Sequence, residues 1–104
     1  MITIATDMGP AMRCIFWIGE YYLQAYPAEA SHILLMLDRV EAMICAEDYI
    51  YDRHAHLFLE ALFAFTRTPT YRRLVPDHHI GYLDHQLAKT RFFVGLAFDI
   101  GERI

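Results

Sequence analysis

Residues 48–67 read DYIYDRHAHLFLEALFAFTR, and this stretch decides the fold. At 100° per residue, one side of a helix here would carry the polar side chains Asp52, Arg53, His56, Glu60 and Arg67. A wide, mostly apolar arc opposite carries Ile50, His54, Leu57, Phe58, Ala61, Leu62 and Phe65. This periodicity predicts an amphipathic helix in the middle of the chain that buries the second face.

Two prolines delimit the helices before this stretch. Pro10 suits a first helical position and Pro27 stops a helix, which predicts a first helix over about residues 10–26. Pro27 can also open a second helix. The expected core face of that helix holds Ile33, Leu37, Val40 and Ile44. Neither Gly nor Pro separates its end from residues 48–67, so the second and third helices could also be one long kinked helix.

Two helical segments are expected after residue 67. Thr68 and Pro69 provide a cap and a first helical position for a short segment that ends before Pro76. Asp77 can cap a last helix over about residues 78–100. The expected core face of the last helix is Ile80, Leu83, Leu87, Val94 and Phe98. The prediction is an all-α fold over residues 1–104, a single helical domain packed as a compact bundle or orthogonal array of four main helices plus one short helical segment.

Composition and charge narrow the classes of partner. The nine Lys and Arg residues are scattered and the net charge is −4, which argues against nucleic-acid binding; Arg72 and Arg73 form the one local pair. No apolar run approaches the roughly 18 to 20 residues of a membrane span. An apolar share of 56% is high for a short chain, so part of the apolar surface is expected to meet another protein.

The cysteines and the start of the chain point to the cytoplasm. Cys14 and Cys45 lie far apart without a CxxC motif, which favours free thiols in a reducing compartment. Both are expected to be buried as small apolar side chains. The first residues contain no pattern typical of an export signal.

Two apolar surfaces are candidates for an interface. The first helix is apolar on most sides, with Trp17 beside its narrow polar stripe. On the last helix, Phe93, Leu96 and Ile100 are expected to continue the outward side as apolar residues. A homodimer that uses these residues is one interpretation. The other is that the first helix or the N-terminal residues cover this surface within one subunit.

Histidine and glutamate spacing suggests a second kind of site. His56 and Glu60 stand one turn apart and could present nitrogen and oxygen to one metal ion. Glu29 and His32 have the ExxH spacing used in di-iron carboxylate bundles. The His56–Glu60 pair is also similar to a fragment of the hemerythrin pattern, but no HxxxH sequence follows it. His54, on the apolar face, is expected to be a core histidine.

The functional expectation is therefore a small acidic helical protein that is not an enzyme, needs no cofactor, acts by binding another protein and self-associates as a homodimer. No cysteine or serine lies in a pattern typical of a nucleophile. Regulators, adaptors and inhibitors are of this type, and phage or mobile-element anti-defence proteins are an analogous class. The alternative is a metal-binding bundle, with di-iron or zinc, that handles oxygen or acts as an enzyme through His56, Glu60, Glu29 and His32.

Overall fold

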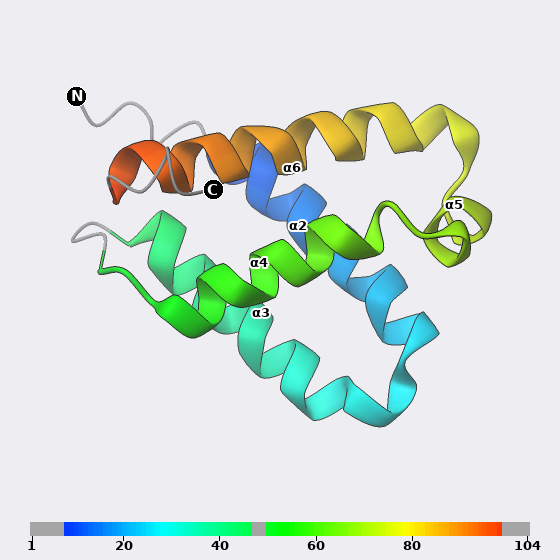
Figure 1. Cartoon of the computed structure of the whole chain (residues 1–104), viewed down its shortest axis with the longest axis horizontal. Helices are drawn as coiled ribbons and strands as arrows, with labels where there is room; N and C mark the ends of the chain where they lie inside the picture. The colour runs from blue at the N-terminus through cyan, green and yellow to red at the C-terminus, as the bar shows by residue number, and fades with distance from the viewer. Residues whose placement is uncertain (1–7, 47–49, 99–104) are drawn as a thin grey trace.

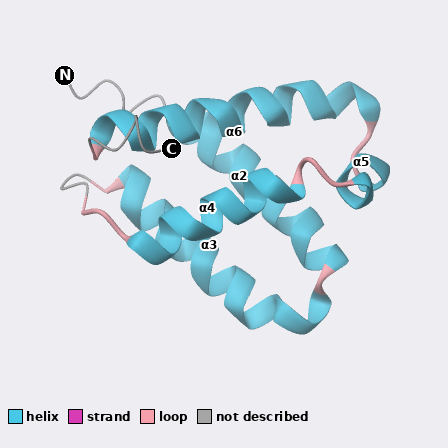
Figure 2. Ribbon diagram, in the orientation of Figure 1, coloured by secondary structure: helices cyan, strands magenta, loops and turns pink. Residues whose placement is uncertain are grey.

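The structure, a computed structural model, describes residues 8–46 and 50–98. The described elements are α2 (Met8–Ala25), the 3-10 helix η1 (Pro27–Glu29), α3 (Ala30–Cys45), α4 (Arg53–Phe65), α5 (Pro69–Leu74) and α6 (Asp77–Ala97) (Figure 1). No strand occurs in the described ranges, as Figure 2 shows. The predicted all-α fold with four main helices and one short helical segment is confirmed.

Helix α2 is the centre of the packing. It contacts both α3 and α6 extensively, while α4 packs mainly on α3. In Figure 1, α6 runs along one edge of the molecule and α2 crosses from it towards the start of α3. Among the residues the structure describes, no helix is both long and apolar enough to cross a membrane.

The core is aliphatic and rich in methionine. The four residues predicted for the core face of α3 are all buried: Ile33, Leu37, Val40 and Ile44. Four thioethers are buried with them: Met8, Met12, Met36 and Met43. Helices α2 and α3 approach closely at Gly19, where an added Cβ would lie 2.7 Å from Leu37 Cδ1. A side chain larger than hydrogen does not fit there without displacing Leu37.

Side-chain caps mark the start of two helices, one of them predicted. The Thr68 hydroxyl accepts a hydrogen bond from Tyr71 N, as the predicted cap of the short segment α5 requires. Asp52 caps α4 by accepting from the backbone N–H groups of His54 and Ala55. The prediction that Asp77 caps the last helix is wrong, because Asp77 is the first helical residue and Pro76 precedes it without a side-chain cap.

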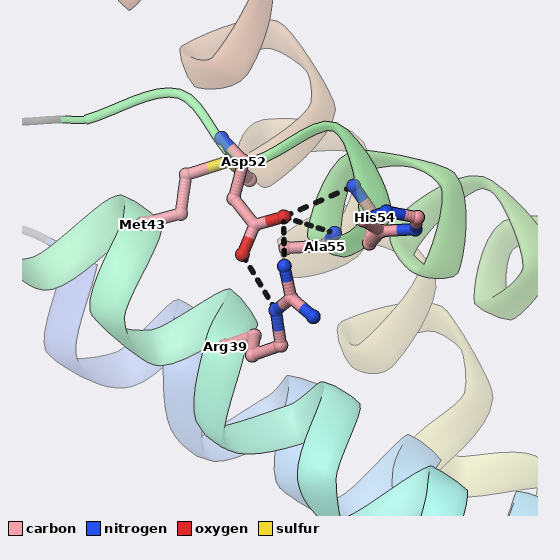
Figure 3. A network of polar contacts seen from close by, with 5 residues as sticks. All are labelled: Arg39, Met43, Asp52, His54 and Ala55. Carbon is pink, nitrogen blue, oxygen red and sulfur yellow. Dashed lines mark hydrogen bonds and ion pairs between the residues drawn. The ribbon is translucent and has the colours of Figure 1, made fainter.

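Helices α3 and α4 are separate, so the hypothesis of one long kinked helix is wrong. Ala46 is extended and ends α3, and Asp52 is extended before α4 begins. Asp52 also accepts two hydrogen bonds from Arg39 of α3, at 2.8 Å to Nε and 3.0 Å to Nη2 (Figure 3). The Arg39 guanidinium lowers the pKa of Asp52 below its usual value, with smaller contributions from the backbone N–H groups. One carboxylate thus ties the start of α4 to the middle of α3.

The buried face of α4 differs from the predicted one. The buried residues are Ala55, Phe58, Leu59, Leu62 and Phe65. Ile50, His54 and Leu57 are exposed, so the prediction of a core histidine at position 54 is wrong. The face is rotated towards His56. Helix α4 packs mainly on α3 and also contacts α2 and α6, and helical periodicity in the sequence does not show which neighbours a face will meet.

One cysteine expectation also needs correction. Cys14 is buried as predicted, but Cys45, the last residue of α3, is exposed. The position follows from the helix end, because the chain leaves the core face one residue after the buried Ile44.

Candidate functional site

The outward side of α6 carries exposed apolar side chains. Phe92 is 69% exposed and Leu96 is 59% exposed, one turn apart. Three more exposed residues continue the same stripe towards the start of the helix: Tyr82, His85 and Lys89. We call these five residues the α6 outer face.

Phe93 was predicted for this outward surface and that prediction is wrong. Phe93 is only 4% exposed and lies on the flank of α6 that also buries Gln86 and Thr90. The neighbouring Phe92 takes the outward position, because successive residues of a helix point about 100° apart. Leu96 is exposed as expected, and Ile100 lies outside the described residues.

Trp17 of α2 lies beside the first half of α6. It is 41% exposed, and its ring meets His79 edge-on at a centroid distance of 5.0 Å. His79 in turn stacks on Tyr82 at 6.4 Å. Two of the predicted interface residues are therefore far apart along α6: Trp17 of α2 packs beside its start, and Leu96 lies near its end.

The His56–Glu60 pair forms part of a polar network between α4 and α6. Tyr51 Oη and His56 Nδ1 share a hydrogen bond of 2.6 Å. Both carboxylate oxygens of Glu60 accept from Arg91 of α6, at 2.8 and 2.9 Å. His56 Nε2 is 3.9 Å from Glu60 Oε2. The glutamate proposed as a metal ligand is thus paired with an arginine 31 positions later in the chain.

The second predicted metal pair lies on a different side of α4. Glu29 and His32 line a pocket of about 260 Å³ with His54 and Leu57. The His32 ring meets Phe58 edge-on at 6.4 Å. Within residues 8–46 and 50–98, no group of three or more His, Cys, Asp or Glu residues could hold a metal ion. The structure therefore does not join the four candidate ligands into one site.

A larger cleft opens between α4, α5 and α6, and sequence analysis missed it. It has a volume of about 470 Å³ and is lined by Phe63, Arg67, Arg72, Asp84, Leu87 and Ala88, among others. Its residues come from α4, the turn after α4, α5 and α6, so no local spacing in the sequence marks them. The Arg72–Arg73 pair was the one signal in the sequence, and only Arg72 lines the cleft.

Neither cysteine sits in an environment that favours a thiolate. Burial raises the pKa of the Cys14 thiol above its usual value, against a smaller opposing effect of a hydrogen bond with Tyr82. Cys45 is exposed as a residue, but partial desolvation and the charge of Glu41 still raise the pKa of its thiol. A cysteine nucleophile requires the opposite shift.

Comparison of the chain with protein families, with curated proteins and with solved structures finds no match.

Proposed function

We propose that this protein acts by binding another protein through the α6 outer face, and that a second copy of the chain is one such partner. The observation that carries the proposal is the exposure of Phe92 and Leu96 on adjacent turns of α6. Covering these side chains would contribute about 1–2 kcal/mol each to binding. Exposed apolar side chains grouped in this way are typical of protein interaction sites.

The composition of the α6 outer face supports a reversible interface. Phe92 and Leu96 supply apolar area, and Tyr82 supplies an aromatic side chain of the type enriched at interfaces. His85 and Lys89 keep the middle of the face polar, so an isolated copy can remain folded in water. Such a face suits a regulator, adaptor or inhibitor that occupies the surface of its partner, as an anti-defence protein of a phage would.

The face is also compatible with pairing to itself. If two α6 helices lie antiparallel about a two-fold axis that crosses the α6 outer face between His85 and Lys89, Phe92 of one copy opposes Tyr82 of the other, and His85 opposes Lys89. Two-fold symmetry makes each contact occur twice, as in most homodimers. Tyr82 and Leu96 are separated by about 21 Å along the helix, enough for a contact several turns long.

Sedimentation velocity over a range of protein concentrations tests the proposal. The wild-type chain should show a concentration-dependent dimer, and Phe92→Ser and Leu96→Ser should shift it to monomer. Leu34→Ser is the matched control, because Leu34 is 55% exposed on α3, away from α6. Circular dichroism checks that each variant keeps its helices.

Two results would contradict parts of the proposal. A wild-type chain that remains monomeric at about 100 µM would exclude a second copy as partner at micromolar affinity. The heterologous partner would then be sought by cross-linking from position 92. Equal loss of binding in Leu34→Ser and Leu96→Ser would show that the α6 outer face has no special role.

A further inference from the structure

We infer that the cleft between α4, α5 and α6 binds a small molecule in which an oxyanion, carboxylate or phosphate, is attached to an apolar body. The volume of about 470 Å³ is in the range of ligand pockets in proteins. This inference is independent of the proposed protein interface, because Phe92 and Leu96 do not line the cleft.

Arg67 is the main positive charge of the cleft. Among the described residues it has no carboxylate partner, and its Cζ atom lies 5.0 Å from the centroid of the Phe63 ring. Arg91 differs from Arg67 in this respect. Its Cζ atom lies 4.0 Å from the centroid of the same ring, but its guanidinium already donates hydrogen bonds to both carboxylate oxygens of Glu60. The free N–H groups of Arg67 are a planar fork that matches the two oxygens of a carboxylate or phosphate.

Arg72 supplies a second set of donors from α5. Its contact with Asp84 is a single one, 3.5 Å from Nη2 to Oδ2, so most of its N–H groups remain free. Asp84 Oδ1 is buried without a hydrogen-bond partner in the described structure, so half of this carboxylate is withdrawn from the cleft. A ligand at the mouth of the cleft meets two positive charges and one negative charge, although the chain as a whole is acidic.

The remaining walls are apolar. Phe63 of α4 and Leu87 and Ala88 of α6 line the cleft beside the arginines. A bare anion would leave this surface in contact with water. An anion with an aromatic or aliphatic body would cover it and gain hydrophobic free energy. The combination therefore selects organic anions over inorganic ones.

Titration followed by NMR of the arginine Nε–Hε signals tests the inference. The probes are phenyl phosphate and benzoate, with inorganic phosphate and acetate as their counterparts without a ring. We expect saturable shifts at Arg67 and Arg72, with a Kd on the order of 1 mM and tighter binding of the ring-bearing anion in each pair. Which pair binds more tightly separates a phosphate from a carboxylate ligand.

Two substitutions with the same change of charge provide the control. Arg67→Gln should weaken binding of phenyl phosphate by about fivefold. Arg73→Gln, on the same short helix as Arg72 but outside the cleft, should leave the affinity unchanged. Asp84→Asn should strengthen binding, because it removes the negative charge that competes for Arg72.

The inference fails if no probe saturates, or if Arg67→Gln and Arg73→Gln weaken binding equally, which would indicate attraction without a site. Equal affinity for phenyl phosphate and inorganic phosphate would remove the role of the apolar walls. Phe92→Ser should bind phenyl phosphate as the wild type does, so the cleft and the protein interface are tested separately.

Discussion

Asp52 offers the sharpest test of how the helices are held together. One side chain caps α4 and pairs with Arg39 of α3, so two substitutions separate the two roles (Figure 3). Asp52→Ala removes both the cap and the ion pair. Asp52→Asn removes the charge but keeps an oxygen that can accept from the backbone N–H groups, since Asn caps helices about as well as Asp.

The expected losses follow from the contacts. Asp52 Oδ1 accepts from His54 N at 3.0 Å and from Ala55 N at 3.2 Å. Replacing such a cap by Ala costs about 1–2 kcal/mol of unfolding free energy. Asp52→Asn should cost clearly less, because only the pairing with the half-exposed Arg39 is lost. In urea, Asp52→Ala should lower the unfolding midpoint by about 1 M.

The pH dependence of the same variants has a defined sign. The native pKa of Asp52 is lowered, mainly by Arg39, so its charge stabilises the fold fully above the ordinary value of 3.8. That stabilisation is lost as the pH falls through the lowered native pKa. The difference between wild type and Asp52→Asn should therefore be constant near neutral pH and disappear in acid below 3.8.

Urea unfolding followed by far-UV circular dichroism measures all of these values. Asp38→Ala is the control, since Asp38 is an exposed aspartate on α3 without an ion pair in the described structure. Asp52→Asn as unstable as Asp52→Ala would refute the assignment of a capping role. Asp52→Ala as stable as Asp38→Ala would refute the whole account of the α3–α4 contact.

Three further outcomes are expected. Gly81→Ala, with open space around it, should stabilise α6 by about 0.5–1 kcal/mol. Gly19→Ala should be about 1–3 kcal/mol less favourable than Gly81→Ala, because its Cβ would force the Leu37 side chain to move. Thermal unfolding compares the two variants, and equal effects would contradict the close approach. Tyr71→Phe should leave stability to urea unchanged or raise it, because the buried hydroxyl has no partner in the described structure, and a large loss would reveal an unrecognised hydrogen bond. Cys45 should react with a thiol reagent in the native protein, and faster as the pH rises, whereas the buried Cys14 should react only after denaturation. Equal reaction rates of the two thiols in the native protein would contradict this expectation.

Local chemistry explains the parts of the fold that sequence analysis predicted. The Thr68–Pro69 start of α5 and the stop at Pro27 depend on neighbouring residues alone, and both occur where expected. The core face of α3 also follows a simple helical period, because α3 buries one continuous face. A window of a few residues contains the information for each of these features.

The orientation of α4 depends on residues that no such window contains. Glu60 can lie half-buried against α6 because its carboxylate pairs with Arg91, which is 31 positions later in the chain. On the same helix His56 is half-buried and Leu57 is exposed. Apolar residues on several sides of α4 allowed more than one buried face, and the choice between them depends on the helices that pack on α4, which are α3, α2 and α6.

The candidate surfaces were predictable to different degrees. Leu96 and Trp17 are exposed as expected, but Phe93 is buried and Phe92, for which no prediction was made, takes the outward position, because adjacent residues differ by only one step around the helix. The cleft could not be predicted, since Arg67, Arg72 and Asp84 meet only after α4, α5 and α6 have packed. The cleft is formed by the tertiary packing of the helices and not by the local sequence of any one of them.

The buried methionines of α2 and α3 should make the core tolerant of small changes in the shape of neighbouring side chains. Met8, Met12, Met36 and Met43 are all buried, and their unbranched, rotatable side chains are of the kind that adapts to irregular space in a core. Oxidation of these methionines would report local unfolding, because peroxide can convert a buried thioether to the sulfoxide only when the core is exposed to solvent. Peptide mass spectrometry of the sulfoxides would therefore show whether α2 or α3 becomes exposed first when the protein unfolds locally.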